Sequence, residues 1–284
     1  MGTELRLKRP WHARLMIFSD LDGTLLDPVT YSWQEATPAL QACIDKDIPI
    51  IMNSSKTGAE MAHLARQMGL SWPYIVENGG GICFPKGGPF QCIEDGTSGR
   101  SLDHVAIGMN YERLSEALLR IAAETGACIR GFSQMSPEDI MALTGLDRKG
   151  AERAMQRQYD EPFLIEHALP DALERIRKAA GRLGLQVTPG GRFYHLHGAF
   201  DKGNAVRWFA DRMKPFGNIR LVGIGDSEND IPMLEEVDIP VWVAPPEKPE
   251  PAVKGLIKSN KATFSGPEAW NQVVLLLIRE RYSR

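Results

Sequence analysis

Cysteine is scarce in this sequence, and long apolar runs are missing. The four cysteines show no metal-type spacing and are sparser than the disulfide frameworks of secreted domains. We therefore expect reduced thiols and a cytoplasmic protein. There is no run of about eighteen apolar residues, so we expect no membrane-spanning helix. Residues 1–13 also lack the apolar stretch of a signal peptide, and we expect them to form a loose leader.

An excess of charge of one sign is absent as well. The formal net charge is −3, and the charged residues form no long basic or acidic block. This balance gives no indication of nucleic acid or an anionic membrane as a partner. Nothing in the sequence specifies an oligomeric state. The chain has 284 residues, 43% of them hydrophobic, and can bury one large core or two smaller ones.

Short apolar runs alternate with helical patterns near both ends of the chain. Residues 15–19, 48–52 and 74–76 are expected strands, separated by expected helices, and the same alternation returns after residue 219. This alternation predicts an α/β fold with a doubly wound, mainly parallel, Rossmann-like core sheet.

The middle of the chain has a different pattern, with several helical segments and few apolar strand runs. We therefore predict an inserted α/β cap domain over residues 97–198. The core domain would then consist of residues 14–96 and 199–284.

Two carboxylates follow the first expected core strand, at the edge where open α/β sheets bind ligands. Asp20 and Asp22 lie in the segment Asp-Leu-Asp-Gly-Thr. Two like charges this close favour a hard divalent cation such as Mg²⁺ between them. One carboxylate could then attack phosphorus while the other transfers protons. Gly23 would allow a sharp turn close to a phosphate. The alternative is a solvated polar turn.

Three further segments carry candidate residues, each with a structural alternative. Asp226 follows a later strand and could ligate the same cation, with Asp230 one helical turn beyond it, or the pair could form an acidic helix cap. Ser54 could bind phosphate oxygens at a helix start or act as a helix cap. Lys202 could offset the charge shared by phosphate and Asp20, or lie on the surface.

Together these segments resemble the haloacid dehalogenase superfamily. The resemblance implies that Asp20 is the nucleophile, that Asp22 is the general acid and base, and that Ser54 and Lys202 bind the phosphoryl group. It also implies Mg²⁺ held by the Asp20 carboxylate, the Asp22 carbonyl and Asp226, with Asn229 and Asp230 in support. An acid at position 22 is the phosphatase version of the motif, because an alkoxide leaving group needs a proton.

Other segments are similar to those of mannosyl-3-phosphoglycerate phosphatases. They are found in both expected domains: Asn53-Ser54-Ser55-Lys56-Thr57, Glu77-Asn78-Gly79-Gly80-Gly81, Gly131-Phe132-Ser133-Gln134-Met135, Tyr159-Asp160-Glu161-Pro162-Phe163 and Gly190-Gly191-Arg192-Phe193-Tyr194-His195. The resemblance implies a hexose joined to 3-phosphoglycerate as substrate and mannosylglycerate, a compatible solute, as product. A large cap suits such a small-molecule phosphate ester, because a protein could hardly enter.

Six residues are candidates for contacts with this substrate: Lys56, Asn78, Gly79, Ser133, Gln134 and Arg192. Each could instead be a satisfied structural group, and we interpret His195 and His197 as structural rather than metal-binding. Other functions remain open: a broader sugar-phosphate phosphatase, a phosphotransferase or mutase, and a catalytically silent binding protein.

Overall fold

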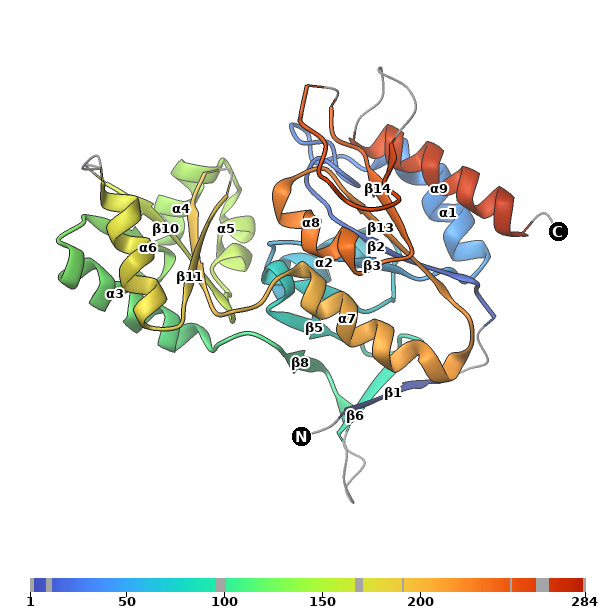
Figure 1. Cartoon of the computed structure of the whole chain (residues 1–284), viewed down its shortest axis with the longest axis horizontal. Coiled ribbons are helices and arrows are strands. Elements are labelled where there is room, and N and C mark those ends of the chain that lie inside the picture. Colours follow the sequence, from blue (N-terminus) through green and yellow to red (C-terminus); the bar gives the residue numbers. More distant parts are fainter. Residues whose placement is uncertain are drawn as a thin grey trace.

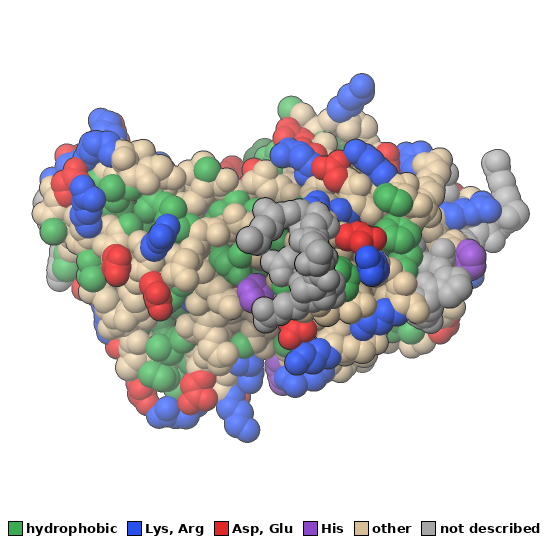
Figure 2. Space-filling model, turned by 90° about the horizontal axis from the view of Figure 1, so that it is seen from below, with side chains coloured by type: hydrophobic (Ala, Val, Ile, Leu, Met, Phe, Trp, Pro, Cys, Tyr) green, Lys and Arg blue, Asp and Glu red, His purple; other side chains and the backbone are tan. Residues whose placement is uncertain are grey.

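The computed structural model forms two lobes, which Figure 1 shows side by side. It describes residues 3–8, 12–94, 101–166, 171–190, 192–245, 247–258 and 266–282. All four cysteines are free, in agreement with the expected reduced thiols. Within the described ranges, no helix is long and apolar enough to cross a membrane. Acidic and basic side chains are interspersed on the face seen in Figure 2.

The larger lobe is built on a five-stranded parallel sheet. Its strands, from edge to edge, are β15 (Ile257–Lys258), β14 (Ile239–Trp242), β13 (Arg220–Gly225), β2 (Leu15–Ser19) and β3 (Ile50–Met52). The interior strand β2 is fully buried, and four of its five residues are apolar, which suits a strand covered on both faces. The predicted Rossmann-like α/β core is confirmed.

Helices cover both faces of this sheet. In Figure 1, α1 (Thr37–Asp45) and α9 (Gly266–Tyr282) pack together on one side, and α7 (Lys202–Met213) and α8 (Ile231–Glu235) lie on the other. Helix α2 (Gly58–Gln67) follows β3 and begins with a capping box made by Thr57 and Glu60.

A small antiparallel sheet continues the core beyond β3. It contains β4 (Tyr74–Val76), β5 (Gly81–Cys83) and β8 (His104–Ala106), and a single bridge between Asn53 and Ile75 joins it to the parallel sheet. Because β8 pairs with β5, the strand pairing places the first junction between the lobes after β8. The predicted boundary at residue 97 is therefore about ten residues too early.

The N-terminal residues were expected to be loose, and this prediction is wrong for Thr3–Leu7. They form β1, which pairs antiparallel with β6 (Phe90–Glu94), and β6 also pairs with β7 (Ser101–Leu102). The physical reason is that Leu5 is 3% exposed and belongs to the main hydrophobic core.

The smaller lobe is the cap, an antiparallel sheet with helices on both faces. The order of its strands is β11 (Gln186–Pro189), β12 (Tyr194–His197), β10 (Asp160–Ile165) and β9 (Ile129–Gly131). Two pairs of helices cover it, namely α3 (Tyr111–Thr125) with α6 (Ala172–Arg182), and α4 (Pro137–Thr144) with α5 (Arg148–Ala154). Helix α5 contacts α2 of the core, so this second pair lies toward the larger lobe in Figure 1.

Candidate active site

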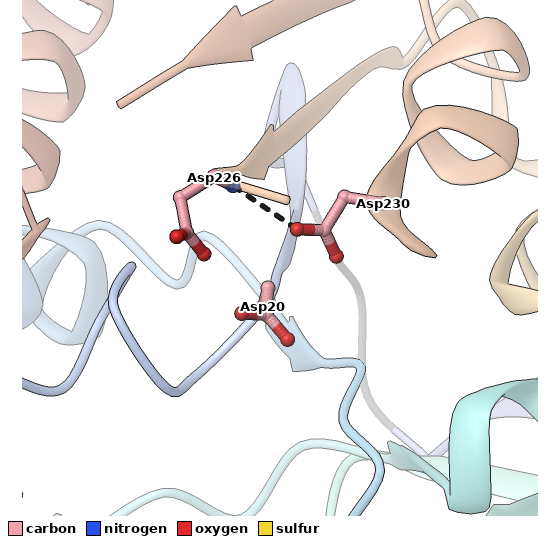
Figure 3. Close-up of side chains that lie close together, drawn as sticks. All are labelled: Asp20, Asp226 and Asp230. Carbon is pink, nitrogen blue, oxygen red and sulfur yellow. Dashed lines mark hydrogen bonds between the residues drawn. The ribbon is translucent and has the colours of Figure 1, made fainter. Parts of the chain in front are cut away.

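Three buried carboxylates meet at the carboxyl ends of β2 and β13. Asp20 follows β2, Asp226 follows the neighbouring strand β13, and Asp230 ends the short helix beyond it. One oxygen from each side chain lies within 4.8 Å of the others, and Figure 3 shows them pointing toward one another. The backbone N–H of Asp226 donates to Asp230 Oδ2 at 3.0 Å, which holds the two acids in place.

Lys202 provides a buried positive charge in this cluster. It is the first residue of α7, is 1% exposed, and its Nζ donates to Asp20 Oδ1 at 2.5 Å and to Asp230 Oδ1 at 2.7 Å. Burial, together with the charges of Asp230 and Asp226, raises the pKa of Asp20 to about 8, although Lys202 opposes the rise. The cluster therefore has more negative charge than Lys202 alone can balance.

The turn after β2 brings the backbone very close to Asp226. Gly23 has φ +84°, and a Cβ there would lie 2.9 Å from Asp226 Oδ2, so a larger residue would displace that carboxylate. Thr24 Oγ1 donates to Asp226 Oδ1 at 3.1 Å. Asp22, in the same turn, keeps 38% of its side chain exposed, and its Oδ2 accepts a bond of 2.7 Å from Lys56 Nζ.

Ser54 lies one strand away from Asp20, as the strand pattern predicted. It follows β3, is 1% exposed, and its Oγ accepts a bond from the backbone N–H of Lys56 at 3.3 Å. The preceding residue, Asn53, donates from Nδ2 to the carbonyl of Lys202 at 3.2 Å. The β3 segment thus supports both the predicted phosphate loop and the start of α7.

Two adjoining cavities lie between the core and the cap. The first has a volume of about 840 Å³ and is lined by Asp20, Asp22, Lys202 and Asp226 of the core, and by cap residues that include His195. The second, of about 440 Å³, is lined by α2 of the core and by α5 and neighbouring segments of the cap. Asp22, Ser55 and His195 line both, so the two cavities meet beside Asp22.

Three of the predicted substrate residues line these cavities. Asn78 lines the first, and its Oδ1 accepts a bond from Asn229 Nδ2 at 3.3 Å, which places the predicted supporting residue Asn229 at the same wall. Lys56 and Arg192 line the second cavity. The guanidinium of Arg192 donates to the carbonyls of Leu143 and Thr144, so it is already engaged at the end of α4.

The other three predicted substrate residues have structural contacts and line neither cavity. Ser133 Oγ donates to Glu161 Oε1 at 2.8 Å, and Gln134 Oε1 accepts the backbone N–H of Gly131 at 3.0 Å. Gly79 has φ +99°, and a Cβ there would lie 2.0 Å from the carbonyl of Asp201. Gly79 therefore allows close packing against the start of α7.

Lys248 is a charged neighbour of the cluster that the sequence analysis missed. Its Nζ donates to Asp226 Oδ2 at 2.6 Å and to the Asp226 carbonyl at 3.1 Å. It lies in the proline-rich segment after β14, which looks like an ordinary surface loop in the sequence. Only the fold brings this lysine back to the end of β13.

A buried polar network between core and cap was also missed. Glu77, at the end of β4, is fully buried and accepts backbone N–H groups from Gln158, Tyr159 and Asp160 of the cap at 2.8–3.1 Å. Arg157 donates to the carbonyl of Ser55 and to Asp160 Oδ2. These bonds hold the cap against the core segment that contains Ser55.

Glu77→Ala should lower the free energy of unfolding by about 2–4 kcal/mol, because it leaves buried N–H groups of the cap without an acceptor. Chemical denaturation would measure the change. Glu138→Ala, at a cap residue whose side chain is 61% exposed, is the matched control and should change stability by less than about 0.5 kcal/mol. Equal stability of the two variants would contradict a cap held by Glu77.

The donors in the acidic cluster suit a hard cation. Asp20, Asp226 and Asp230 offer only oxygen ligands, are buried, and repel one another. Asp22 Oδ1 is a buried atom without a hydrogen-bond partner among the residues that the structure describes. The described residues thus include a three-carboxylate cluster that could hold a metal ion.

The comparison with known proteins first shows the general class of enzyme to which this chain is similar. A family model described as haloacid dehalogenase-like hydrolase matches residues 17–92. The fold is similar to a sucrose-phosphatase from Synechocystis (TM-score 0.59, 17% identity, 95% of this chain and 98% of that chain). It is also similar to a haloacid dehalogenase-like hydrolase from Bacteroides thetaiotaomicron (TM-score 0.63, 14% identity, 93% and 99%). At these identities the likeness concerns the fold.

Curated relatives with higher sequence identity then show the particular family within this class. The chain is 36% identical to a glucosyl-3-phosphoglycerate/mannosyl-3-phosphoglycerate phosphatase from Persephonella marina, over 94% of this chain and 98% of the relative. It is 33% identical to a mannosyl-3-phosphoglycerate phosphatase from Pyrococcus horikoshii, over 78% and 88%. The chain belongs to the mannosyl-3-phosphoglycerate phosphatase family, which confirms the resemblance seen in the sequence.

Proposed function

We propose that this protein is a Mg²⁺-dependent phosphatase that hydrolyses mannosyl-3-phosphoglycerate, or a close glycosyl analogue, to the glycosylglycerate and phosphate. The observation that carries the proposal is the pairing of Asp20 with buried Lys202 at the strand ends, beneath a cavity of about 840 Å³ that the cap covers. The names of the relatives support the choice of substrate. The four free cysteines support a cytoplasmic setting.

In the first step, a carboxylate oxygen of Asp20 attacks phosphorus and forms an aspartyl-phosphate. The bond from phosphorus to the glycerate oxygen breaks, and Asp22 gives that oxygen a proton. Lys202 and the Ser54 loop bind the phosphoryl oxygens. In the second step, Asp22 takes a proton from water as the water oxygen attacks phosphorus, which releases phosphate and restores Asp20.

Mg²⁺ would be held by the Asp20 carboxylate, the Asp22 carbonyl and Asp226, with Asp230 supporting this group. When bound, it offsets the negative charge of the phosphoryl group and of the carboxylates. Asp230 has a positioning role, because it bonds both Lys202 Nζ and the backbone N–H of Asp226. The bond to Lys202 Nζ also keeps this ammonium directed at Asp20.

Asp22→Asn should slow hydrolysis of alkyl phosphates by about 10²–10⁴-fold, because asparagine cannot protonate the leaving oxygen. In this first step the loss should be much smaller with p-nitrophenyl phosphate, whose leaving group is stable without a proton. Single-turnover release of the alcohol or of p-nitrophenol would measure the first step alone, because the later water step uses Asp22 with both esters. Equal losses in the first step would show that Asp22 does not act as the acid.

A screen of phosphate release with Mg²⁺ tests the proposed function as a whole. Mannosyl- and glucosyl-3-phosphoglycerate should react with a higher kcat/KM than glucose 6-phosphate or sucrose 6-phosphate. Equal rates on all four would favour a broader sugar-phosphate phosphatase. A phosphorylated isomer without free phosphate would indicate a mutase, and no reaction with any ester would favour a silent binding protein.

A further inference from the structure

We propose that the second cavity between core and cap is the binding site for the carboxylate of the glycerate leaving group, with Arg153 as its contact. This inference rests on the proposed function and deepens it. It concerns the part of the substrate that leaves with the sugar, whereas the residues above concern the phosphoryl group.

The position of the cavity suits this role. Asp22 lines both cavities, and the proposed mechanism places the leaving oxygen at Asp22. The glycerate carboxylate lies only a few bonds from that oxygen. A leaving group that departs from Asp22 can therefore extend its carboxylate into the second cavity while the phosphoryl group stays in the first.

The charges that line the second cavity favour an anion. Its lining includes four lysine or arginine side chains and only two carboxylates, those of Asp22 and Glu60. Three of the cations are engaged: Lys56 pairs with Asp22, Arg157 pairs with Asp160, and Arg192 bonds backbone carbonyls. The fourth cation is Arg153.

Arg153 combines a fixed backbone with an uncommitted side chain. It lies near the end of α5, and its carbonyl accepts a bond of 2.8 Å from Thr57 Oγ1 of the core. Its guanidinium makes no hydrogen bond or ion pair with the parts of the chain that the structure describes. An arginine held in this way suits a carboxylate, which it can bind through two parallel N–H groups.

His195, on β12 of the cap sheet, lines the same cavity. Its Nδ1 lies 2.7 Å from Asp160 Oδ2. Burial would raise the pKa of Asp160, but His195 and Arg157 hold that pKa well below its usual range. An ionised carboxylate only accepts hydrogen bonds, so Nδ1 carries the proton of this bond. With its proton on Nδ1, the ring has only a lone pair on Nε2, so His195 can accept a hydrogen bond from a substrate hydroxyl but does not bind the carboxylate.

Two esters that differ only in the carboxylate would test the site. They are mannosyl-3-phosphoglycerate and its analogue with CH₂OH in place of the carboxylate, each given to the full chain with Mg²⁺. Arg153→Gln should lower kcat/KM on the first ester by about 10–100-fold and on the analogue by less than about threefold. Arg153→Lys should restore part of the loss, and His195→Gln should not show this selectivity for the carboxylate.

Arg148→Gln is the matched control, because Arg148 lies on the same helix but outside the cavity, with its side chain 59% exposed. It should change neither rate. Equal losses on both esters in Arg153→Gln, or no loss on either, would overturn the carboxylate site.

Calorimetry separates this inference from the proposed function, because mannosylglycerate carries the carboxylate but no phosphate. If the wild type hydrolyses neither ester, the proposed function fails. Weaker binding of mannosylglycerate to Arg153→Gln than to the wild type would then still support the carboxylate site. Equal binding to both proteins, or no binding to either, would overturn it.

Discussion

Asp20→Asn should reduce phosphate release by about 10⁴-fold or more, because the amide cannot attack phosphorus and no aspartyl-phosphate can form. Steady-state rates with Mg²⁺ and mannosyl-3-phosphoglycerate would measure the loss. Mass spectrometry after rapid acid quench should detect the phosphorylated wild type and no phosphorylated variant. A variant with more than about a tenth of wild-type activity would contradict the role of Asp20.

The same variant should not be less stable, and this separates loss of chemistry from loss of fold. Burial and the neighbouring carboxylates raise the pKa of Asp20 above its usual value. An acid whose pKa is raised by folding stabilises the protein at low pH, and that stability is lost as the pH rises through the raised value. Without divalent cation, the free energy of unfolding of the wild type should therefore fall between about pH 4 and pH 8.

Asp20→Asn removes this titration, so its free energy of unfolding should vary less over the same pH range. Denaturation in EDTA at several pH values would compare the two proteins. A variant that is unfolded at neutral pH, or that keeps the pH dependence of the wild type, would contradict the electrostatic account of the cluster.

The catalytic candidates could be found in the sequence because their placement depends on local rules. Parallel strands end at one edge of the sheet, so Asp20, Ser54 and Asp226 were expected together there. The structure brings them to adjacent strand ends, with Lys202 among them. Gly23 was expected to allow a sharp turn close to a phosphate, and the structure shows a φ of +84° there, with a Cβ at this position only 2.9 Å from Asp226 Oδ2.

The cap contacts could not be predicted in this way, because they depend on how two lobes pack. Ser133 and Gln134 have side chains suited to a sugar, but each has a nearby partner within the cap. Arg153 has no motif around it, and its position is set by the packing of α5 against α2. His195 was interpreted as structural, and the sequence did not show its bond to Asp160, which lies 35 residues away.

The N-terminal strand illustrates the same limit. Thr3–Leu7 looks polar and carries no helix or turn signal, so a loose segment was a reasonable expectation. Its partner β6 lies more than eighty residues away, and only that pairing buries Leu5. The pairing of a strand with a partner far away in the chain cannot be predicted from the local sequence of that strand alone.

Lys202→Met should have the second large effect, on stability as well as on activity. The ammonium group forms ion pairs with the buried carboxylates of Asp20 and Asp230. Its removal leaves the three carboxylates of Asp20, Asp226 and Asp230 close together without this positive charge. Without divalent cation, the free energy of unfolding should fall by about 3–5 kcal/mol, because a buried charge loses its partner. Phosphate release should fall by about 10²–10³-fold, because the phosphoryl group loses a positive charge.

Lys248→Met is the matched comparison, because it removes the same kind of charge from the same acidic cluster. The side chain of Lys248 is 43% exposed, whereas that of Lys202 is fully buried, and water can replace an exposed ammonium. Lys248→Met should therefore cost less than about 1 kcal/mol of stability at neutral pH. Saturating Mg²⁺ should reduce the deficit of Lys202→Met, because a divalent cation offsets the same carboxylates. Equal destabilisation by the two variants, unaffected by Mg²⁺, would mean that burial of Lys202 between Asp20 and Asp230 does not determine the stability of this site.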